Sequence, residues 1–213
     1  MIGIFGGTFD PIHYGHLRSA LEVKEIFELS EVRFIPSAQP PHRDQPAATA
    51  LMRLDMLRLA IKKQPGLTID TREINRTGPS YMVDTLKSLR GEFKDEPLLL
   101  FIGSDAFNNI KAWHQWQHLF AYSHIVVMTR PGFEIKNLDE FFNLRLANEI
   151  SELALNLAGK LYFQQVTQLD ISATAIRKMI AEQKNPGFLL PDTVIAYIRL
   201  HKLYQRHQSH HLH

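Results

Sequence analysis

PLLLFIG, residues Pro97–Gly103, is the stretch that decides the fold of this chain. Every residue between its proline and its glycine is apolar, which is the pattern of a strand buried on both faces of a sheet. HIVVMTRPG, residues His124–Gly132, is a second segment of this kind. Strands covered on both faces are typical of parallel sheets, so the two segments predict a parallel sheet with helices on either side.

The segments around this pair alternate between strand and helix patterns. The further predicted strands are Ile2–Phe5, Glu31–Pro36, Leu67–Asp70 and Lys160–Val166. The predicted helices cover residues 17–29, 50–65, 81–93, 138–158, 172–183 and 191–203, with Thr49, Ser80 and Ser172 as N-terminal caps. Residues 37–49 are rich in proline and are expected to form an exposed loop. The alternation predicts a doubly wound α/β fold.

The composition is that of an ordinary globular protein, with 45% hydrophobic and 22% charged residues among 213. We predict one domain over residues 1–206 and a polar, His-rich tail, 207–213, that is solvated rather than metal-binding. A formal net charge of +2 gives no electrostatic reason to expect a nucleic-acid partner. The absence of cysteine excludes thiol catalysis and sulfur-ligated metals. Without a visible secretory signal or membrane-length apolar run, we expect a cytoplasmic protein with no membrane partner.

GGTFDPIHYGH, residues Gly6–His16, directly follows the first predicted strand. In a doubly wound fold ligands bind beyond the carboxyl ends of the strands, where Gly6 and Gly7 would let a ligand approach bare backbone. The next helix is expected to begin near His16, so its free N–H groups and positive dipole end face the same place. This combination is typical of a phosphate site.

His13 and His16 are three residues apart, so both imidazoles can lie on one side of the helix entrance. There they can donate hydrogen bonds to phosphate oxygens and neutralise developing charge. The glycine pattern matches neither G-x-G-x-x-G nor the P-loop. Two alternatives stay open for these residues alone. One is a turn whose histidines only cap a helix, and the other is a metal site, although no third ligand stands at a suitable spacing.

Near the other end of the chain, ISATAIR (Ile171–Arg177) offers a second helix start directed at phosphate. Ser172 is a natural N-cap, and Thr174 adds a hydroxyl. Arg177 follows about a turn and a half later, with a guanidinium group that binds phosphate bidentately. Taken alone, this spacing occurs often by chance. If both helix starts converge at one sheet edge, they form a cradle for a polyphosphate.

Together the two motifs resemble the signatures of the H-x-G-H nucleotidyltransferases. Within that superfamily the chain is most similar to the bacterial nicotinate mononucleotide adenylyltransferases. The other segments of the family pattern follow in order: PPHR (40–43), GPSYMVDTL (78–86), FIGSDAF (101–107), AWHQW (112–116), TRPG (129–132) and the ending LLPDTVIAYI…LY. The similarity extends from residue 2 to about residue 204.

The resemblance implies a Rossmann-like nucleotidyltransferase fold and an enzyme of NAD biosynthesis. Members of the family transfer AMP from ATP to nicotinate mononucleotide with the help of Mg²⁺, releasing pyrophosphate and forming nicotinate adenine dinucleotide. The acceptor 5′-phosphate attacks the α-phosphorus in line. The implied catalytic residues are His13, His16 and Arg177. The implied ATP-binding residues are Gly6, Gly7, Thr8, Phe9, Gly103, Asp105, Ser172, Ala173 and Thr174.

For the acceptor, the resemblance implies that Trp113 stacks on the pyridine ring and that backbone N–H groups near Val83 and His114 bind its carboxylate. The full implied acceptor set is His42, Arg43, Ser80, Tyr81, Val83, Trp113, His114 and Arg130. No protein side chains are implied as metal ligands. Met82 departs from the family pattern, which has Thr there, and this puts one polar contact to the substrate in question.

Three alternatives share the superfamily motifs. The first is phosphopantetheine adenylyltransferase, which is usually shorter and lacks the Trp113 segment and PPHR. The second is an enzyme that takes nicotinamide mononucleotide in place of the acid, and the sequence separates it less well. The third is a non-catalytic nucleotide sensor on the same fold, against which the intact His13, His16 and Arg177 argue.

Overall fold

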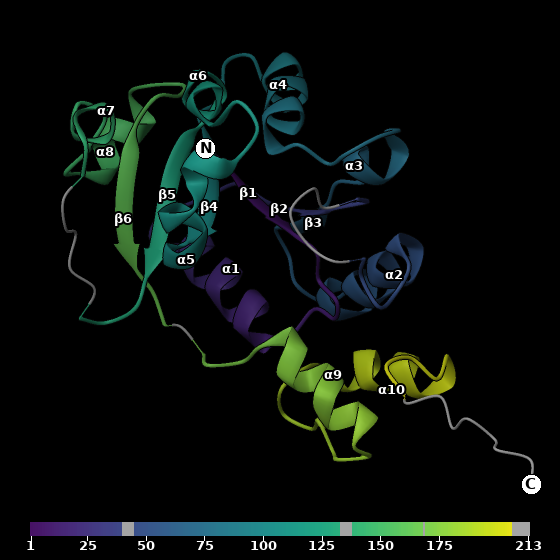
Figure 1. Cartoon of the computed structure of the whole chain (residues 1–213). Coiled ribbons are helices and arrows are strands. Elements are labelled where there is room, and N and C mark those ends of the chain that lie inside the picture. Colours follow the sequence, from purple (N-terminus) through teal and green to yellow (C-terminus); the bar gives the residue numbers. More distant parts are fainter. Residues whose placement is uncertain (40–44, 133–137, 168, 206–213) are drawn as a thin grey trace, which may run out of the picture.

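The computed structural model describes residues 1–39, 45–132, 138–167 and 169–205. These residues form a six-stranded, wholly parallel sheet in the order β3-β2-β1-β4-β5-β6. The strands are β1 Ile2–Gly7, β2 Glu31–Pro36, β3 Leu67–Ile69, β4 Leu98–Gly103, β5 His124–Thr129 and β6 Leu161–Gln165. The predicted doubly wound α/β class is confirmed (Figure 1).

The strand order reverses between β1 and β4. From β1 the chain moves outward to β2 and β3, and it then returns to place β4 against the other side of β1. A parallel sheet opens a crevice outside the carboxyl ends of its strands at such a reversal. Gly7 ends β1 and Gly103 ends β4, so both glycines lie at this crevice.

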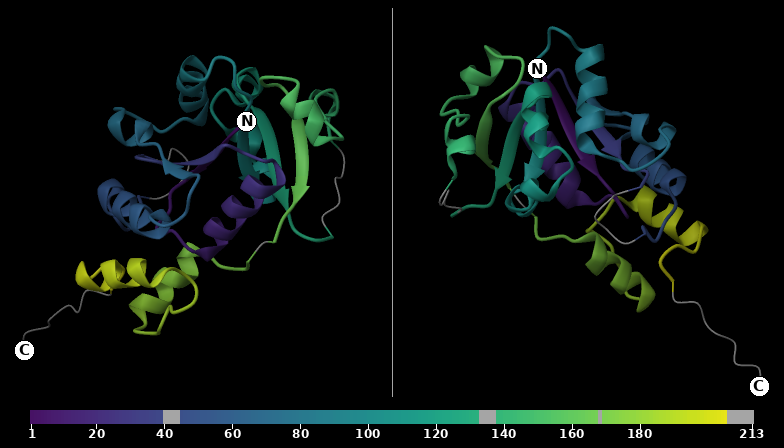
Figure 2. Two further views of the ribbon diagram at one scale, coloured as in Figure 1. Left: turned by 180° about the vertical axis from the view of Figure 1, so that it is seen from behind. Right: turned by 45° about the horizontal axis from the view of Figure 1, so that its top comes forward.

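Helices cover both faces of the sheet because successive strand residues point to opposite sides. In β4, Leu99 and Phe101 belong to a core shared with α1, α2 and α10. Leu98, Leu100 and Ile102 belong to a second core shared with α4 and α6. The two helical layers are visible from behind and from above (Figure 2). These helices are α1 Tyr14–Ile26, α2 Ala50–Ile61, α4 Met82–Glu92, α6 Leu119–Tyr122 and α10 Asp192–Leu200.

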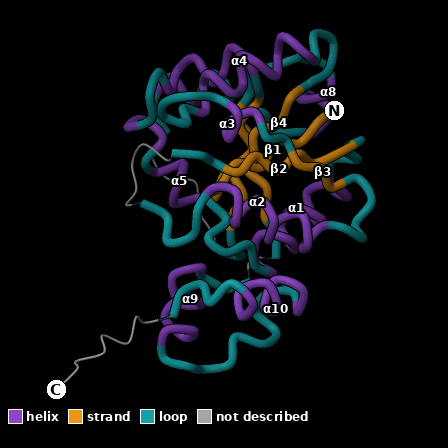
Figure 3. Tube along the Cα trace, turned by 90° about the vertical axis from the view of Figure 1, so that its right-hand side faces the viewer, coloured by secondary structure: helices purple, strands orange, loops and turns teal. Residues whose placement is uncertain are grey.

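The C-terminal helices α9 (Ala173–Ala181) and α10 form an additional layer outside α1 and α2 (Figure 3). Between them, the carbonyl of Leu189 accepts a hydrogen bond from the amide of Tyr14 at 3.0 Å. Tyr14 is the first residue of α1, so the end of the chain is attached directly beside the first predicted motif.

Two of the three predicted caps are confirmed. Thr49 and Ser172 accept hydrogen bonds from the amides three residues ahead of them, at the starts of α2 and α9. The Ser80 cap is wrong, because Tyr81 occupies the N-cap position of α4. The Ser80 hydroxyl instead accepts hydrogen bonds from the amides of Ala38 and Gln39. It therefore holds the chain just after β2.

The predicted helix over residues 138–158 is also wrong in its extent. Only α7 (Glu140–Asn143) and α8 (Ile150–Ala154) are helical there. Between them the amide of Ala147 donates to the carbonyl of Leu161, and Leu146 forms a parallel bridge to Leu161. The leucines of this region are thus divided between short helices and a strand-like edge contact.

Other boundaries differ more modestly. Helix α1 begins two residues earlier than expected, at Tyr14, and α2 ends at Ile61, so Gly66 lies in the turn before β3. The loop predicted to be exposed has buried ends, since Ser37 and Ala48 are 9% and 2% exposed. The short helices missing from the prediction are α3 Arg72–Asn75, α5 Ser104–Asn108, η1 Ile110–Ala112, η2 Trp116–His118 and α6 Leu119–Tyr122.

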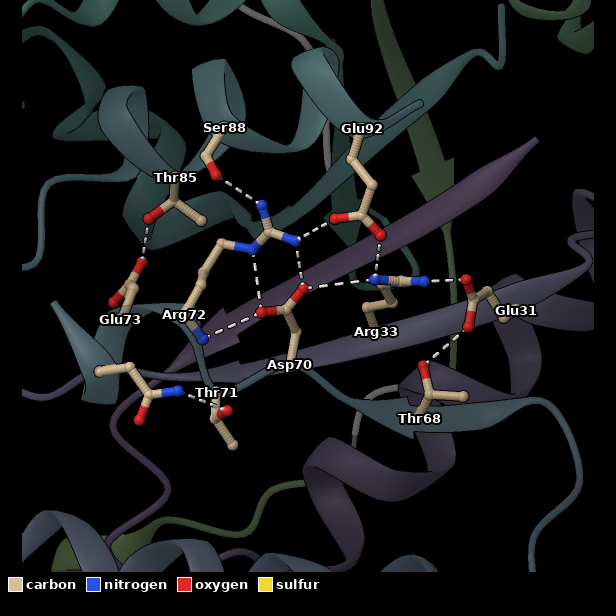
Figure 4. Close-up of polar contacts among 11 residues, drawn as sticks. Glu31, Arg33, Thr68, Asp70, Thr71, Arg72, Glu73, Thr85, Ser88 and Glu92 are labelled. Atoms are coloured by element: carbon tan, nitrogen blue, oxygen red, sulfur yellow. Dashed lines mark hydrogen bonds and ion pairs between the residues drawn. The ribbon is translucent and has the colours of Figure 1, made fainter. Parts of the chain in front are cut away.

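An ion-pair network fastens β2 and β3 to α4 (Figure 4). Arg72 grips the buried Asp70 carboxylate through Nε at 2.9 Å and Nη2 at 2.7 Å. Arg33 reaches the same carboxylate at 3.3 Å, and both arginines also pair with Glu92 near the end of α4. Arg72 additionally donates to Ser88 at 2.8 Å. The network holds the edge of the sheet against one helix.

No helix in the described ranges is both long enough and apolar enough to cross a bilayer.

Candidate active site

The exit of β1 has no room for side chains. A Cβ on Gly7 would lie 2.8 Å from the ring of Phe9, and one on Gly6 would lie 2.5 Å from the terminal methyl of Met82. Phe9 itself adopts φ 51°, which is unusual for a residue with a large side chain. The glycines therefore allow the backbone to turn tightly here.

The two histidines of the motif lie together at the start of α1. His13 is the N-cap, and its ring stacks on that of His16 with centroids 3.7 Å apart. The amide of His13 approaches Nδ1 of His16 at 3.4 Å, so in the neutral form of His16 the proton sits on Nε2. A Cβ on Gly15 would come within 3.0 Å of the His13 ring, which explains the glycine between the histidines.

His13 is 5% exposed, and burial lowers its pKa to about 4. Its Nδ1 is buried and has no hydrogen-bond partner among the described residues. A buried polar atom without a partner costs free energy unless a ligand satisfies it. His13 is therefore neutral at physiological pH.

The side chain of Phe9 is buried against the histidine pair and is not exposed to a ligand. It is 2% exposed, and its ring meets the rings of His16 and Phe34 edge-on at 5.2 and 5.6 Å. The carbonyl of Thr8 already has a hydrogen-bond partner, because it accepts from Arg53 at 2.6 Å. Both residues hold the turn in place.

The second motif reaches the first across the whole sequence. Nη1 of Arg177 donates to the carbonyl of Asp10 at 2.7 Å, and Nη2 contacts the hydroxyl of Thr174 at 3.3 Å. Ser172 caps the same helix, and Ala173 is its first residue. The expected convergence of the two helix starts at one sheet edge is therefore present in the fold.

A pocket of ≈ 320 Å³ lies at the carboxyl ends of β4 and β5. It is lined by Gly103, Ser104, Asp105 and Arg130. β4 is the neighbour of both β1 and β5, so this pocket and the β1 exit occupy the same edge of the sheet. Asp105 is exposed there, and its carboxylate is available to hydroxyl groups of a ligand.

Five of the residues expected to bind the acceptor lie at the start of α4 or in the segment before η2: Ser80, Tyr81, Val83, Trp113 and His114. Arg130 lies apart from them, in the pocket at the ends of β4 and β5. The rings of Tyr81 and His114 stack with centroids 4.3 Å apart. Trp113 is half-buried at the border of the core under α4 and so keeps part of its ring accessible. Val83 is buried, and its amide is among the first N–H groups of α4, which have no acceptor within the helix.

His42 and Arg43 lie outside the described residues, as does the His-rich tail. No group of three or more potential metal-binding side chains is found in the described ranges.

The sequence analysis did not identify Asp10, Arg53 and Tyr204. The Arg53 side chain is 1% exposed, and its guanidinium donates to the carbonyls of Thr8, Ser37, Ala38 and Ala48. One signal was available, because Arg53 shares a helical stripe with the buried Leu57 and Ile61. Tyr204 closes the LLPDTVIAYI…LY segment of the family pattern, but the resemblance implies no site role for it.

Comparison with known proteins gives a consistent result. Residues 4–179 match the family model described as cytidylyltransferase-like. A probable nicotinate-nucleotide adenylyltransferase of Methylococcus capsulatus is 49% identical over 97% of this chain and 100% of its own length. One from Pseudomonas putida is 46% identical, covering 96% of this chain and 94% of the relative.

Among solved structures, Plasmodium falciparum nicotinic acid mononucleotide adenylyltransferase complexed with NaAD superposes with a TM-score of 0.71. It covers 95% of this chain and 96% of its own, at 19% identity, which establishes the shared fold. The family model and the identity to the bacterial relatives establish the family as well as the fold. The chain belongs to the cytidylyltransferase-like family and, within it, to the nicotinate-nucleotide adenylyltransferases.

Proposed function

We propose that this chain transfers the AMP group of ATP to nicotinate mononucleotide, giving nicotinate adenine dinucleotide and pyrophosphate, as a step of NAD biosynthesis. The observation that carries the proposal is the meeting of the two phosphate-directed motifs, where Arg177 donates to the carbonyl of Asp10 at 2.7 Å. Two helix starts, two imidazoles and a guanidinium then face one sheet edge, as a triphosphate requires.

The chemistry needs no protein nucleophile. An oxygen of the acceptor 5′-phosphate forms a bond to the α-phosphorus, and the bond from that phosphorus to the bridging oxygen breaks. Pyrophosphate leaves with the electron pair. Catalysis then rests on alignment of the two phosphates and on stabilising the charge that develops during transfer.

Each group at the β1 exit has a part in this proposal. His16 donates from Nε2 to the transferring phosphoryl group, and the neutral His13 donates to a neighbouring phosphate oxygen. Arg177, with Ser172, Ala173 and Thr174 at the start of α9, holds the β- and γ-phosphates. Gly6 and Gly7 allow those phosphates to approach the main chain, and Thr8 and Phe9 shape the turn.

The ribose or adenine of ATP lies in the pocket of Gly103 and Asp105, where a carboxylate suits a ribose hydroxyl. The pyridine ring stacks on Trp113, and the amides near Val83 and His114 bind its carboxylate. Ser80, Tyr81 and Arg130 complete the acceptor side, with His42 and Arg43 directed at the acceptor phosphate.

We include Mg²⁺ in the proposal as a companion of ATP, held by phosphate oxygens and water rather than by a cage of side chains. When bound, it neutralises part of the triphosphate charge. We also propose a cytoplasmic location, the compartment where a bacterial cell keeps its ATP.

Pyrophosphate release from ATP with Mg²⁺ tests the function, with nicotinate mononucleotide, its amide and phosphopantetheine as parallel acceptors. We expect strong preference for nicotinate mononucleotide and a loss of about 10²–10⁴-fold in kcat for His16→Ala. Activity with phosphopantetheine alone would overturn the choice of acceptor. Absence of turnover with every acceptor, in protein that binds ATP, would favour a nucleotide sensor.

A further inference from the structure

The carboxylate of Asp10 is buried, accepts hydrogen bonds from several parts of the chain and has no role in the proposed chemistry. It is 5% exposed and accepts hydrogen bonds from the amides of Ala47 at 2.8 Å and Ala48 at 3.2 Å, and from the hydroxyl of Tyr204 at 2.7 Å. The main-chain carbonyl of the same residue holds Arg177. Asp10 thus joins the turn after β1 to the segment before α2 and to both C-terminal helices.

Tyr204 is held in an unusual position to make its contact. It follows α10 with φ 62°, in the left-handed region that a tyrosine rarely adopts. Burial and the neighbouring Asp10 carboxylate raise its pKa, so the hydroxyl remains protonated and donates at physiological pH. The contact spans 194 positions in the sequence.

The opposite side of the turn is fixed by Arg53. Its guanidinium donates to the carbonyls of Thr8 at 2.6 Å and Ser37 at 2.7 Å, and these residues follow β1 and β2. The turn after β1 is therefore held at two points. Arg53 of α2 bonds the carbonyl of Thr8, and Tyr204 near the C-terminus bonds the carboxylate of Asp10. Without the Tyr204 contact, the Asp10 carboxylate is held only by the amides of Ala47 and Ala48. The Asp10 peptide, whose carbonyl accepts from Arg177, is then less firmly fixed.

We propose that Tyr204 is a positioning residue for adenylyl transfer, whose hydroxyl fixes Asp10 so that the Asp10 carbonyl aims Arg177 at the triphosphate. The proposal rests on the assignment of Arg177 to the β- and γ-phosphates. Arg177 also lies 3.9 Å from the Asp10 carboxylate. Asp10 therefore orients the guanidinium through its carbonyl and attracts it through its negative charge.

Tyr204→Phe removes one oxygen and leaves the ring. We expect kcat/KM for ATP to fall by about ten- to a hundredfold, because small misplacements of a phosphate-binding group have effects of this order. The KM for the acceptor should stay within about twofold of wild type. Tyr197→Phe is the matched control, since Tyr197 lies on α10, the helix that Tyr204 follows, and its hydroxyl reaches Asp55 on α2 at 3.3 Å. It should leave the kinetics unchanged.

A double-mutant cycle separates positioning from general destabilisation. In an Arg177→Ala background, Tyr204→Phe should cause little further loss in kcat/KM for ATP, because the group that it orients is already gone. An equal fractional loss in both backgrounds would overturn the proposal. So would a Tyr204→Phe protein with a lower Tm and unaltered kinetics.

Direct titration of ATP by calorimetry keeps this test independent of the acceptor. We expect weaker ATP binding for Tyr204→Phe and unchanged binding for Tyr197→Phe. A wild-type protein that bound ATP but transferred AMP to no acceptor would refute the proposed function alone. Equal ATP affinity in wild type and Tyr204→Phe would refute the positioning role alone.

Discussion

The imidazole rings of His13 and His16 stack at a centroid distance of 3.7 Å and an interplanar angle of 25°. Two imidazolium cations so close together would repel each other, so the pair favours at most one charge. Burial lowers the pKa of His13 to about 4. His13 is therefore the neutral member of the pair at physiological pH.

Acid should destabilise the fold through His13. Its pKa is 6.5 in the unfolded chain and about 4 in the folded one, so between these values the unfolded state binds the extra proton. The free energy of unfolding consequently falls as the pH falls through this window. At about pH 5 the loss should be about 2 kcal/mol larger for wild type than for His13→Asn, as measured by urea unfolding.

The buried His124 also has a lowered pKa, caused mainly by burial, but it is present in both proteins and cancels in the comparison. Equal losses in wild type and His13→Asn would contradict the assignment.

Alanine should be tolerated at Gly6 much better than at Gly7. A Cβ at Gly6 meets the flexible end of Met82, whereas one at Gly7 meets the rigid ring of Phe9, which packs against His16. We expect Gly7→Ala to lower kcat/KM by about 10²-fold and Gly6→Ala to lower it by roughly fivefold or less. Steady-state kinetics with ATP as the varied substrate would measure both, and a larger loss for Gly6→Ala would contradict this account.

Loss of the Trp113 ring should weaken acceptor binding without affecting ATP. We expect Trp113→Ala to raise the KM for nicotinate mononucleotide about tenfold, while Trp113→Phe keeps most of the stacking. Initial rates with each substrate varied in turn provide the measurement. An unchanged KM for nicotinate mononucleotide in Trp113→Ala would show that Trp113 does not bind the acceptor.

The ion pairs around Asp70 should contribute to stability and not to activity. We expect Asp70→Asn to lower the free energy of unfolding by about 2–3 kcal/mol, because it leaves two partly buried arginines short of a partner. Replacing the exposed Glu25, which pairs with Arg18 at 3.9 Å, should change stability little. Chemical unfolding measures both, and a kcat/KM loss that exceeds the stability loss would contradict this separation.

Burial alone would raise the pKa of Asp70, but hydrogen bonds and charge from Arg72 reverse the effect and lower it. The stabilisation of the fold by the ionised Asp70 carboxylate is therefore present at neutral pH. It is lost as the pH falls through the folded-state pKa, below the ordinary value of 3.8.

Features that depend on neighbouring residues could be predicted from the sequence. The apolar run of β4 indicates a strand covered on both sides, and Thr49 and Ser172 cap helices through amides three residues away. The glycines and histidines of the first motif likewise act within one short turn.

Features that depend on distant partners could not be predicted. The Ser80 hydroxyl is taken by the amides of Ala38 and Gln39, and this competition overrides its local tendency to cap. The stripe shared with Leu57 and Ile61 indicates that Arg53 faces the core, but its carbonyl acceptors on Thr8 and Ser37 are brought together only by the fold. The leucines of residues 138–158 have helical spacing, but pairing of Leu146 with Leu161 interrupts the helix.

The contact between Arg177 and Asp10 joins residues 167 positions apart. During translation, β1 and its histidines emerge from the ribosome long before the arginine does. A growing chain therefore lacks Arg177 and its contact with Asp10 until synthesis is almost complete. Premature termination anywhere before residue 177 leaves a polypeptide without this guanidinium and without its contact to the turn after β1.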